Sequence, residues 1–228
     1  MSNVEFENSY WKKHNQLLEE RHKLVLELLK DLKFHSLIDI ACGSGLLLSY
    51  IDCEEKFGID ISQVALKKAK RIGIVKQCDI EKEKCPFKQK FDVITLTDVL
   101  EHTTTPDLLF KNICHNGNIV IVTVPNFSFI GCRLKSLLGM IPRIWDEKHG
   151  HCFFYNYEKL DEVLRRNGFL IQVNKHYFPL MRNRIFRIFS MMIGLVFPNF
   201  WATEFCVIAQ KQPHDNFVED MMGGEQIK

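Results

Sequence analysis

Acidic side chains recur at nearly even intervals in the first half of the chain, at Asp39, Asp60, Asp79 and Asp98. Each follows or closes a short apolar run, in the segments SLIDIA, FGIDI, VKQCDI and FDVITLTDV. A carboxylate accepts hydrogen bonds from two neighbouring hydroxyl groups, so acids in this pattern suit a ligand that carries a ribose diol. Alternatively, each acid begins a turn or caps a helix. The repetition at one register favours a shared ligand-binding edge over four separate turns.

A turn of small residues follows the first acid, in the segment Asp39-Ile-Ala41-Cys42-Gly43-Ser-Gly45. Small side chains let a ligand approach the backbone, and the helix that follows presents free N–H groups at its first turn. The glycine spacing differs from the G-x-G-x-x-G fingerprint of dinucleotide-binding proteins. This difference disfavours a nicotinamide-dependent oxidoreductase.

A second group of reactive side chains is Asp98-Val-Leu-Glu101-His102, followed later by His149 and His151 in the segment KHGHCFFY. An imidazole accepts a proton near neutral pH, so His102 is a candidate general base for an acceptor hydroxyl group. Alternatively, Asp98, Glu101 and His102 hold a divalent metal ion together with one of the two later histidines. Such an ion polarises the acceptor oxygen. The sequence leaves both interpretations open.

The elements that must position these residues follow from hydrophobic periodicity. Apolar residues at helical spacing predict an N-terminal helix over residues 10–31 and later helices, among them 158–167 and 182–197. Apolar runs bounded by turns predict strands at residues 36–41, 57–61, 75–80, 91–99, 118–125, 169–178 and 202–211. Because strands alternate with helices, we expect an α/β fold with a doubly wound, mostly parallel sheet and helices on both faces.

Five segments resemble, in this order, the successive motifs of class I S-adenosylmethionine-dependent methyltransferases: DIACGSG, GIDIS, QCDIEK, FDVITLTDVLEH and GNIVIVTVPN. The resemblance covers roughly residues 34–178 and is nearest to small-molecule and quinone-precursor O-methyltransferases. It departs at Ala41, where the family has the first glycine of its turn. It implies a Rossmann-like, seven-stranded sheet whose seventh strand is antiparallel, with S-adenosylmethionine as the cofactor.

The resemblance also implies roles for single residues. Those expected to bind the cofactor are Asp39, Ala41, Cys42, Gly43, Gly45, Asp60, Ile61, Asp79, Ile80, Thr97 and Asp98. Within this set, the turn would hold the methionine part, Asp60 the ribose and Asp79 the adenine edge. The catalytic residues are expected to be His102, Glu101 and His151. Tyr10 and Trp11 either close over the cofactor or pack on the edge of the sheet.

We expect one domain over residues 1–211 and a flexible tail over 212–228. The domain divides into a cofactor-binding half (34–125), an acceptor lid segment (126–157) and C-terminal helices and strands (158–211). The net charge of +2 conceals an uneven distribution. Residues 126–211 carry 12 Lys and Arg against 6 Asp and Glu, whereas residues 1–125 carry 17 against 18. This excess favours an anionic or lipid-linked small-molecule acceptor.

Composition narrows the class and the partners. A hydrophobic content of 46% with 25% charged residues excludes a disordered or fibrous chain. None of the eight cysteines forms a C-x-x-C pair and the N-terminus has no apolar signal region, so a cytoplasmic protein without zinc is expected. The 182–197 helix either contacts a membrane peripherally or covers the core. Nucleic acid is not an expected partner, and the sequence allows a monomer or a homodimer.

The most favoured function is therefore O-methylation by in-line methyl transfer to a small-molecule, lipid-linked or anionic acceptor. Two alternatives are a non-catalytic, methyltransferase-like regulatory subunit and a metal-assisted RNA 2′-O-methyltransferase.

Overall fold

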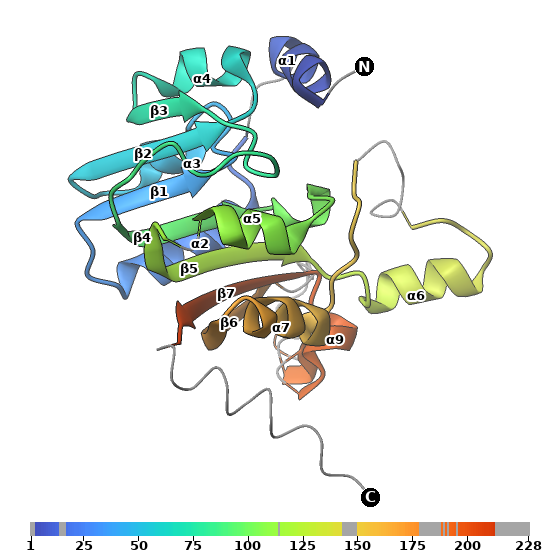
Figure 1. The fold of residues 1–228 in the computed structure, drawn as a ribbon. Helices are drawn as coiled ribbons and strands as arrows, with labels where there is room; N and C mark the ends of the chain where they lie inside the picture. The colour runs from blue at the N-terminus through green and yellow to red at the C-terminus, as the bar shows by residue number, and fades with distance from the viewer. Residues whose placement is uncertain are drawn as a thin grey trace, which may run out of the picture.

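A seven-stranded sheet in the order β3-β2-β1-β4-β5-β7-β6 forms the centre of the protein (Figure 1). The computed structural model describes residues 3–13, 17–113, 115–142, 150–177, 188, 190, 192–194 and 196–212. The strands are β1 (Ser36–Ile40), β2 (Glu55–Asp60), β3 (Ile74–Gln77), β4 (Phe91–Thr97), β5 (Gly117–Pro125), β6 (Phe169–Tyr177) and β7 (Glu204–Lys211). The helices are α1 (Asn3–Lys13), α2 (Glu20–Lys30), α3 (Leu46–Tyr50), α4 (Gln63–Ala69), the 3-10 helix η1 (Leu100–His102), α5 (Pro106–Ile113), α6 (Ile130–Leu137), α7 (Tyr157–Arg166) and α9 (Pro198–Trp201).

Strand direction confirms the predicted fold class. β1 pairs in parallel with both β2 and β4, and β4 pairs in parallel with β5. β7 lies antiparallel to β5 on one side and to β6 on the other. The sheet is therefore mostly parallel with an antiparallel seventh strand, which is the predicted Rossmann-like arrangement.

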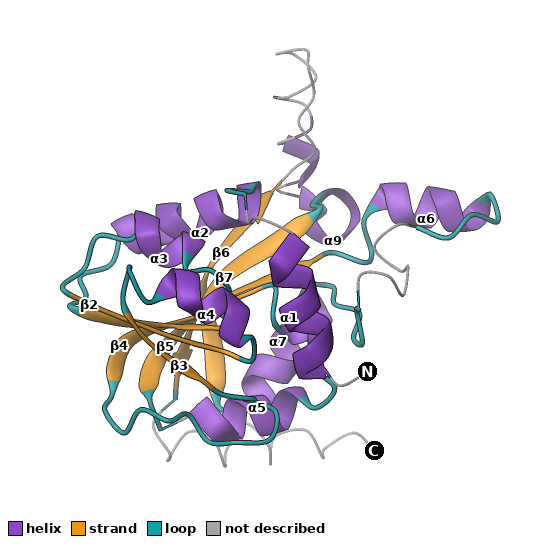
Figure 2. Ribbon diagram, turned by 90° about the horizontal axis from the view of Figure 1, so that it is seen from above, coloured by secondary structure: helices purple, strands orange, loops and turns teal. Residues whose placement is uncertain are grey.

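Helices cover both faces of the sheet (Figure 2), and alternating side chains of its strands pack into one of two core layers. Leu37 of β1 packs with α2, α3 and α4, whereas its neighbour Ile38 packs with α5 and α7. Helices cover both core layers, because the strands of a parallel sheet bury their side chains on both faces of the sheet. The carboxyl ends of β1, β2 and β4 consequently meet at one edge, where a ligand can reach them.

The N-terminal region differs from the single helix predicted over 10–31. The structure has two helices, α1 and α2, with residues 17–19 outside both. Glu19 starts α2 through a capping box, in which the Glu19 N–H donates to His22 Nδ1 at 3.0 Å. α1 instead packs beside α4, where Asn8 Oδ1 accepts hydrogen bonds from Ser62 Oγ and the Val64 N–H. The cap at Glu19 thus begins a second helix within a stretch for which hydrophobic periodicity alone predicts one continuous helix.

The segment predicted as a lid contains a helix that periodicity missed, α6, which extends away from the sheet beyond its carboxyl edge (Figure 1). Most of the predicted 182–197 helix, including Arg182, Arg184 and Arg187, and the tail from residue 213 onward lie outside the described residues. Within the described ranges, none of the helices has the length and apolar character that a membrane crossing requires.

The turn after β1 uses left-handed backbone at three positions. Ala41, Gly43 and Gly45 have φ values of 58°, 54° and 79°. A Cβ atom at Gly45 would lie 3.0 Å from Ile72 Cδ1 and 3.1 Å from Ala69 Cβ, so glycine is needed there for close packing as well as for conformation. Ala41 is strained instead, because the Cβ atom of an L residue with left-handed backbone clashes with that backbone.

Replacing Ala41 by glycine should stabilise the protein. A left-handed L residue costs about 1–2 kcal/mol, and the extra chain entropy of glycine offsets about 0.5–1 kcal/mol of that gain. We expect Ala41→Gly to raise the free energy of unfolding by up to about 1 kcal/mol in urea titrations. The matched control is Ala65→Gly within α4, which should lower it by about 0.5–1 kcal/mol. Equal destabilisation by both variants would show that the Ala41 backbone is not strained.

At the opposite edge of the sheet, Asp92 ties β4 to the start of β1. Its Oδ2 accepts hydrogen bonds from the backbone N–H groups of His35 and Ser36 at 2.8 and 2.9 Å and from Ser36 Oγ at 3.2 Å. The Ser36 and His35 N–H groups lower the pKa of Asp92, because they stabilise its charged form.

Because the folded pKa of Asp92 is below its unfolded value, the ionised side chain stabilises the fold above pH 4 and loses this effect as the pH falls through the folded pKa. We expect Asp92→Asn to be less stable than the wild type at pH 7 and to approach it near pH 2–3. Ser36→Ala removes one donor of the three and should show a smaller difference. A destabilisation by Asp92→Asn that is constant from pH 7 to pH 2 would exclude this linkage.

Candidate active site

Asp39, at the end of β1, is a buried carboxyl group inside the candidate cofactor turn. Its Oδ1 accepts a hydrogen bond from Thr95 Oγ1 of β4 at 2.7 Å. Burial raises its pKa to about 7, the Thr95 hydrogen bond opposes this shift, and the charge of Asp60 adds to it. Asp39 therefore titrates near neutral pH in the free protein and lies where a cationic ligand group would favour its ionised form.

Asp60, at the end of β2, braces the turn after β1 from the neighbouring strand. Its Oδ2 accepts the Gly43 N–H at 2.8 Å, and its Oδ1 accepts the Ser62 N–H at 2.7 Å. Each carboxylate oxygen has a second lone pair, so these bonds leave capacity for two ligand hydroxyl groups. Cys42 completes the contact between the two strands, because its N–H donates to the Ile59 carbonyl and its sulfur packs against Gly58.

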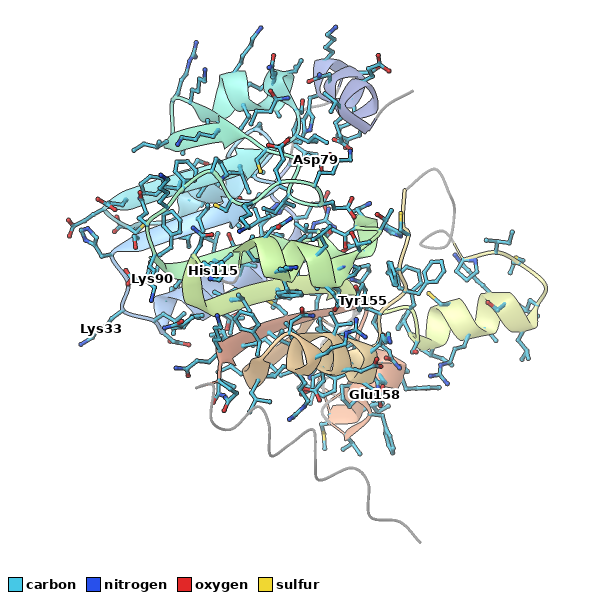
Figure 3. The ribbon with its side chains drawn as sticks, viewed as in Figure 1. Lys33, Asp79, Lys90, His115, Tyr155 and Glu158 are labelled. Carbon is cyan, nitrogen blue, oxygen red and sulfur yellow. The ribbon has the colours of Figure 1, made fainter. Side chains whose placement is uncertain are left out.

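The predicted adenine contacts lie in the loop after β3 on the same edge (Figure 3). Asp79 forms an ion pair with Lys82 at 2.7 Å, and its carbonyl accepts the N–H groups of Lys82 and Glu83. Ile80 is buried, and Ile61 is partly exposed at the start of the loop after β2. Asp79 thus also helps to form a turn, which is the alternative role that the sequence allows for each of the four acids.

Asp98 follows β4 with left-handed backbone, at φ 53°. Its Oδ1 accepts a hydrogen bond from Thr123 Oγ1 at 2.8 Å, and its Oδ2 pairs with the guanidinium of Arg21, which comes from α2. Burial raises the pKa of Asp98, and Arg21 opposes that shift. Non-glycine residues in strained backbone are typical of functional sites. Strained backbone at a non-glycine residue thus occurs at the ends of two neighbouring strands, at Ala41 after β1 and at Asp98 after β4.

Glu101 in η1 is the least satisfied polar group of this edge. The side chain is 1% exposed, and within the described chain no other residue donates a hydrogen bond to either of its oxygens. Burial raises its pKa well above the usual range, and the nearby charge of Asp98 adds to the effect. A buried carboxyl group without donors is costly, so it requires a proton or a cation.

His102 and His151 lie beside Glu101. The two rings are 4.8 Å apart between centroids, and His102 Nδ1 is 3.3 Å from the Gly150 carbonyl oxygen. The Glu101 carbonyl accepts the N–H groups of Cys152 and Phe153, which holds the His151 segment against η1. One ligand atom from each of Glu101, His102 and His151 lies within 4.8 Å of the others. The fold thereby brings together residues that are about fifty positions apart.

His151 is the candidate later histidine that the structure places at this cluster, since His149 lies outside the described residues. Asp98, the fourth predicted member, faces Arg21 and Thr123 instead. Tyr155 anchors the same segment at this edge (Figure 3), since the Phe127 N–H donates to its carbonyl at 2.9 Å.

Several residues of the site were missed by the sequence analysis. Arg21 lies in a charged stretch of a predicted helix, Thr123 lies inside an apolar strand, and Glu204 begins β7. Burial raises the pKa of Glu204 to about 9, with a further contribution from the charge of Asp98. None of the three stands in a recognisable spacing, because only the tertiary fold brings them to Asp98.

Unsatisfied buried atoms collect at this edge. They include Thr97 Oγ1, both oxygens of Glu101 and Glu204 Oε1, none of which has a partner within the described residues. Buried polar atoms are almost always paired in folded proteins, so unpaired ones at strand ends indicate groups that a ligand completes.

Comparison with known proteins assigns this arrangement to a family. A model described as a methyltransferase domain matches residues 10–172. No curated protein sequence matches the chain significantly.

Among solved structures, the chain is similar in fold to the small RNA methyltransferase HEN1, with a TM-score of 0.62 and 17% identity over 88% of this chain and 27% of that one. It therefore spans about a quarter of the HEN1 chain. It is also similar to magnesium protoporphyrin IX methyltransferase from Synechocystis PCC 6803 (TM-score 0.60, 14% identity, 92% and 95% covered). A third similar fold is an S-adenosylmethionine-dependent methyltransferase from Clostridium acetobutylicum ATCC 824 (TM-score 0.59, 14% identity, 92% and 98% covered).

The family match extends over most of the chain and contains the turn after β1, the acids at the strand ends and His151. Together with the sheet order, it shows that the chain belongs to the methyltransferase domain family, with the class I, S-adenosylmethionine-dependent methyltransferase fold.

Proposed function

We propose that the protein transfers the methyl group of S-adenosylmethionine to an oxygen of its acceptor, with a divalent cation held by Glu101, His102 and His151. The observation that carries this proposal is the Glu101 carboxyl group, buried without a donor from any other described residue and within 4.8 Å of two imidazoles. One oxygen and two nitrogen ligands suit a divalent transition ion such as Mn²⁺, and Mg²⁺ enters such sites with additional water ligands.

The residues at the ends of β1 and β2 fit the cofactor. Asp39 would face its methionine part, because a carboxyl group with a pKa near 7 is readily ionised beside an ammonium group. Asp60 would accept the ribose hydroxyl groups on its remaining lone pairs while it keeps Gly43 in place. Thr97, whose buried hydroxyl group has no partner among the described residues, ends β4 and would face the transferred methyl group. Bound S-adenosylmethionine supplies a methyl group already activated for in-line displacement.

The chain itself then contributes position and charge. The sheet holds the strand ends rigidly, and restricting the reacting groups to one geometry accounts for much of the rate in a displacement of this kind. A bound divalent cation would act as a Lewis acid and lower the pKa of the acceptor hydroxyl group. The side chains of Glu101, His102 and His151 would fix the acceptor oxygen at the end of β4.

Charge balance supports the cation. Asp98, Glu101 and Glu204 are three carboxyl groups at one edge, and Arg21 forms an ion pair with only the first of them. Burial of unpaired like charges is costly, and this is why the pKa values of Glu101 and Glu204 are raised. Two added positive charges would allow these groups to ionise together.

An apolar, small-molecule or lipid-linked acceptor is the class that the surroundings favour. Phe127 lies 5.7 Å from the His151 ring and 4.5 Å from the Phe154 ring between centroids, so aromatic surface borders the cluster. HEN1 acts on small RNA by its name, but a nucleic-acid site requires a stripe of exposed lysine and arginine side chains. Among the described residues, the aromatic side chains of Phe127 and Phe154 stand next to the cluster instead.

Cofactor binding is tested by thermal unfolding. At one hundred times the dissociation constant, S-adenosylhomocysteine should add about 2.7 kcal/mol of stability, whereas a nicotinamide dinucleotide should add none. Asp39→Asn should lose at least half of the resulting shift in Tm, and the control Asp92→Asn, at the opposite edge, should keep it. Because the pKa of Asp39 is about 7, the wild-type shift should also fall between pH 8 and pH 6. Stabilisation by the dinucleotide alone would contradict the proposed cofactor.

Metal binding is tested by calorimetry with Mn²⁺ on the full chain. The wild type should bind one ion, and Glu101→Gln and His151→Ala should each weaken binding at least about tenfold. Glu162→Gln, on the exposed side of α7, is the control that should bind normally. Without metal, Glu101→Gln should be at least as stable as the wild type, because it removes an uncompensated buried carboxyl group.

The outcome that contradicts the metal proposal is unchanged Mn²⁺ affinity in Glu101→Gln, or methyl transfer that survives complete chelation. In that case His102 would remain as the general base, and loss of turnover in His102→Ala would support it.

A further inference from the structure

α6 is an amphipathic helix whose apolar side faces outward. Leu134, Leu137 and Leu138 follow the spacing i, i+3 and i+4, which places them on one face of the helix and its C-cap, and Ile141 follows after the left-handed Gly139. Leu137 is 84% exposed and Ile141 78%, and Leu134 and Leu138 are more than half exposed. A surface helix normally turns this face toward the core. Here the buried residue of α6 is Cys132, on the opposite side.

Cations border the apolar face. Arg133 and Lys135 lie about 100° to either side of Leu134 on the helix, and both are exposed. The sequence contains no acidic residue between Asn126 and Trp145. An apolar stripe with cations along both margins is the pattern of helices that lie in the headgroup region of a bilayer.

A second exposed apolar group lies next to α6. Ile188, Met192 and Val196 recur every four residues, and Phe197 and Phe200 follow at the start of and within α9. All five are exposed. The Arg133 guanidinium lies 5.8 Å from the centre of the Phe200 ring, which joins the two groups, and Figures 1 and 2 both show α9 beside the base of α6. This second stretch, residues 178–203, also contains no acidic residue.

We propose that α6, together with the exposed side chains of Ile188, Met192, Val196, Phe197 and Phe200, forms a docking surface for an anionic lipid bilayer. The leucine side chains would enter the headgroup boundary, while Arg133 and Lys135 meet anionic headgroups at its margin. Charge complementarity selects a bilayer over a second copy of this chain. A two-fold symmetric dimer through α6 would bring Arg133 and Lys135 of both copies together with no acidic residue of α6 to offset them.

The surface adjoins the candidate active site. Phe127, three residues before the start of α6, has its ring 5.7 Å from the His151 ring and 4.5 Å from the Phe154 ring between centroids. A protein docked in this way would place its acceptor cluster close to the headgroups. The inference concerns binding alone and does not depend on the proposed metal or on methyl transfer.

The test is sedimentation of the full chain with vesicles in the absence of cofactor and metal. We expect binding to vesicles of phosphatidylcholine with 30–40% phosphatidylglycerol to exceed binding to pure phosphatidylcholine by about tenfold or more, and to fall as salt rises. Leu134→Glu/Leu137→Glu should reduce binding at least about tenfold. The matched control is Leu17→Glu/Ile74→Glu, which makes the same chemical change at exposed positions outside α6 and should bind as the wild type.

A variant without the two cations separates the electrostatic contribution to vesicle binding from the apolar contribution. Arg133→Gln/Lys135→Gln should lose about tenfold in affinity for anionic vesicles and little for neutral ones. Unchanged far-ultraviolet circular dichroism and Tm will show that each variant is folded, as expected for exposed positions.

Equal binding to neutral and anionic vesicles, or equal loss in the α6 and control variants, would overturn the proposal. So would a dimer in light scattering that Leu134→Glu/Leu137→Glu converts to a monomer, because the apolar face would then be an interface between copies. Since methyl transfer is assayed separately, failure of vesicle binding leaves the proposed function unaffected.

Discussion

The cost of burying carboxyl groups at one edge of the sheet is the constraint on which the site depends. Asp39 and Asp60 are buried at the ends of β1 and β2, and Asp98 and Glu101 follow β4. A fold accepts such burial only where donors or cations compensate it. For the first two acids, Thr95 and the backbone of Gly43 and Ser62 provide donors. Of the last two, only Asp98 pairs with the Arg21 guanidinium, and Glu101 is left without a partner among the described residues. The proposed cofactor region is thus compensated by donors of the chain itself, whereas the proposed acceptor region would need a bound cation.

Backbone strain adds to the energetic cost of building this edge of the sheet. Ala41 and Asp98 are left-handed without being glycine, and both stand where a parallel strand stops. Strain at these points is tolerated because the neighbouring strands pair on both sides and restrict the alternatives. At the other edge, where no ligand is expected, Asp92 satisfies the first N–H groups of β1 without strained geometry. Stability and function are thus located at opposite ends of the same strands.

The elements after β5 differ in kind from those before it. Before β5, the acids Asp39 and Asp60 belong to strands that pair on both sides and pack between two core layers. Beyond β5, two backbone hydrogen bonds to the Glu101 carbonyl and one from the Phe127 N–H to the Tyr155 carbonyl attach the His151 segment, and α6 follows Phe127 with its apolar face outward. Such a division lets one cofactor scaffold accept different acceptors, because changes in the attached segment do not disturb the sheet.

The resemblance to the methyltransferase family implied the antiparallel seventh strand. The sequence by itself determined the mostly parallel sheet and the acids Asp39, Asp60 and Asp98 near its strand ends, because buried parallel strands have a local hydrophobic signature and an acid that ends one is visible in the pattern. It did not determine the break between α1 and α2, since helical periodicity continues across a capping box that only backbone geometry reveals. The sequence identified Glu101, His102 and His151 only as three of several candidate catalytic or metal-binding residues. Tertiary structure alone decided that these three meet, that Asp98 pairs with Arg21, and that α6 turns its leucines outward. These outcomes depend on contacts between residues far apart in the chain, and local spacing holds no information about them.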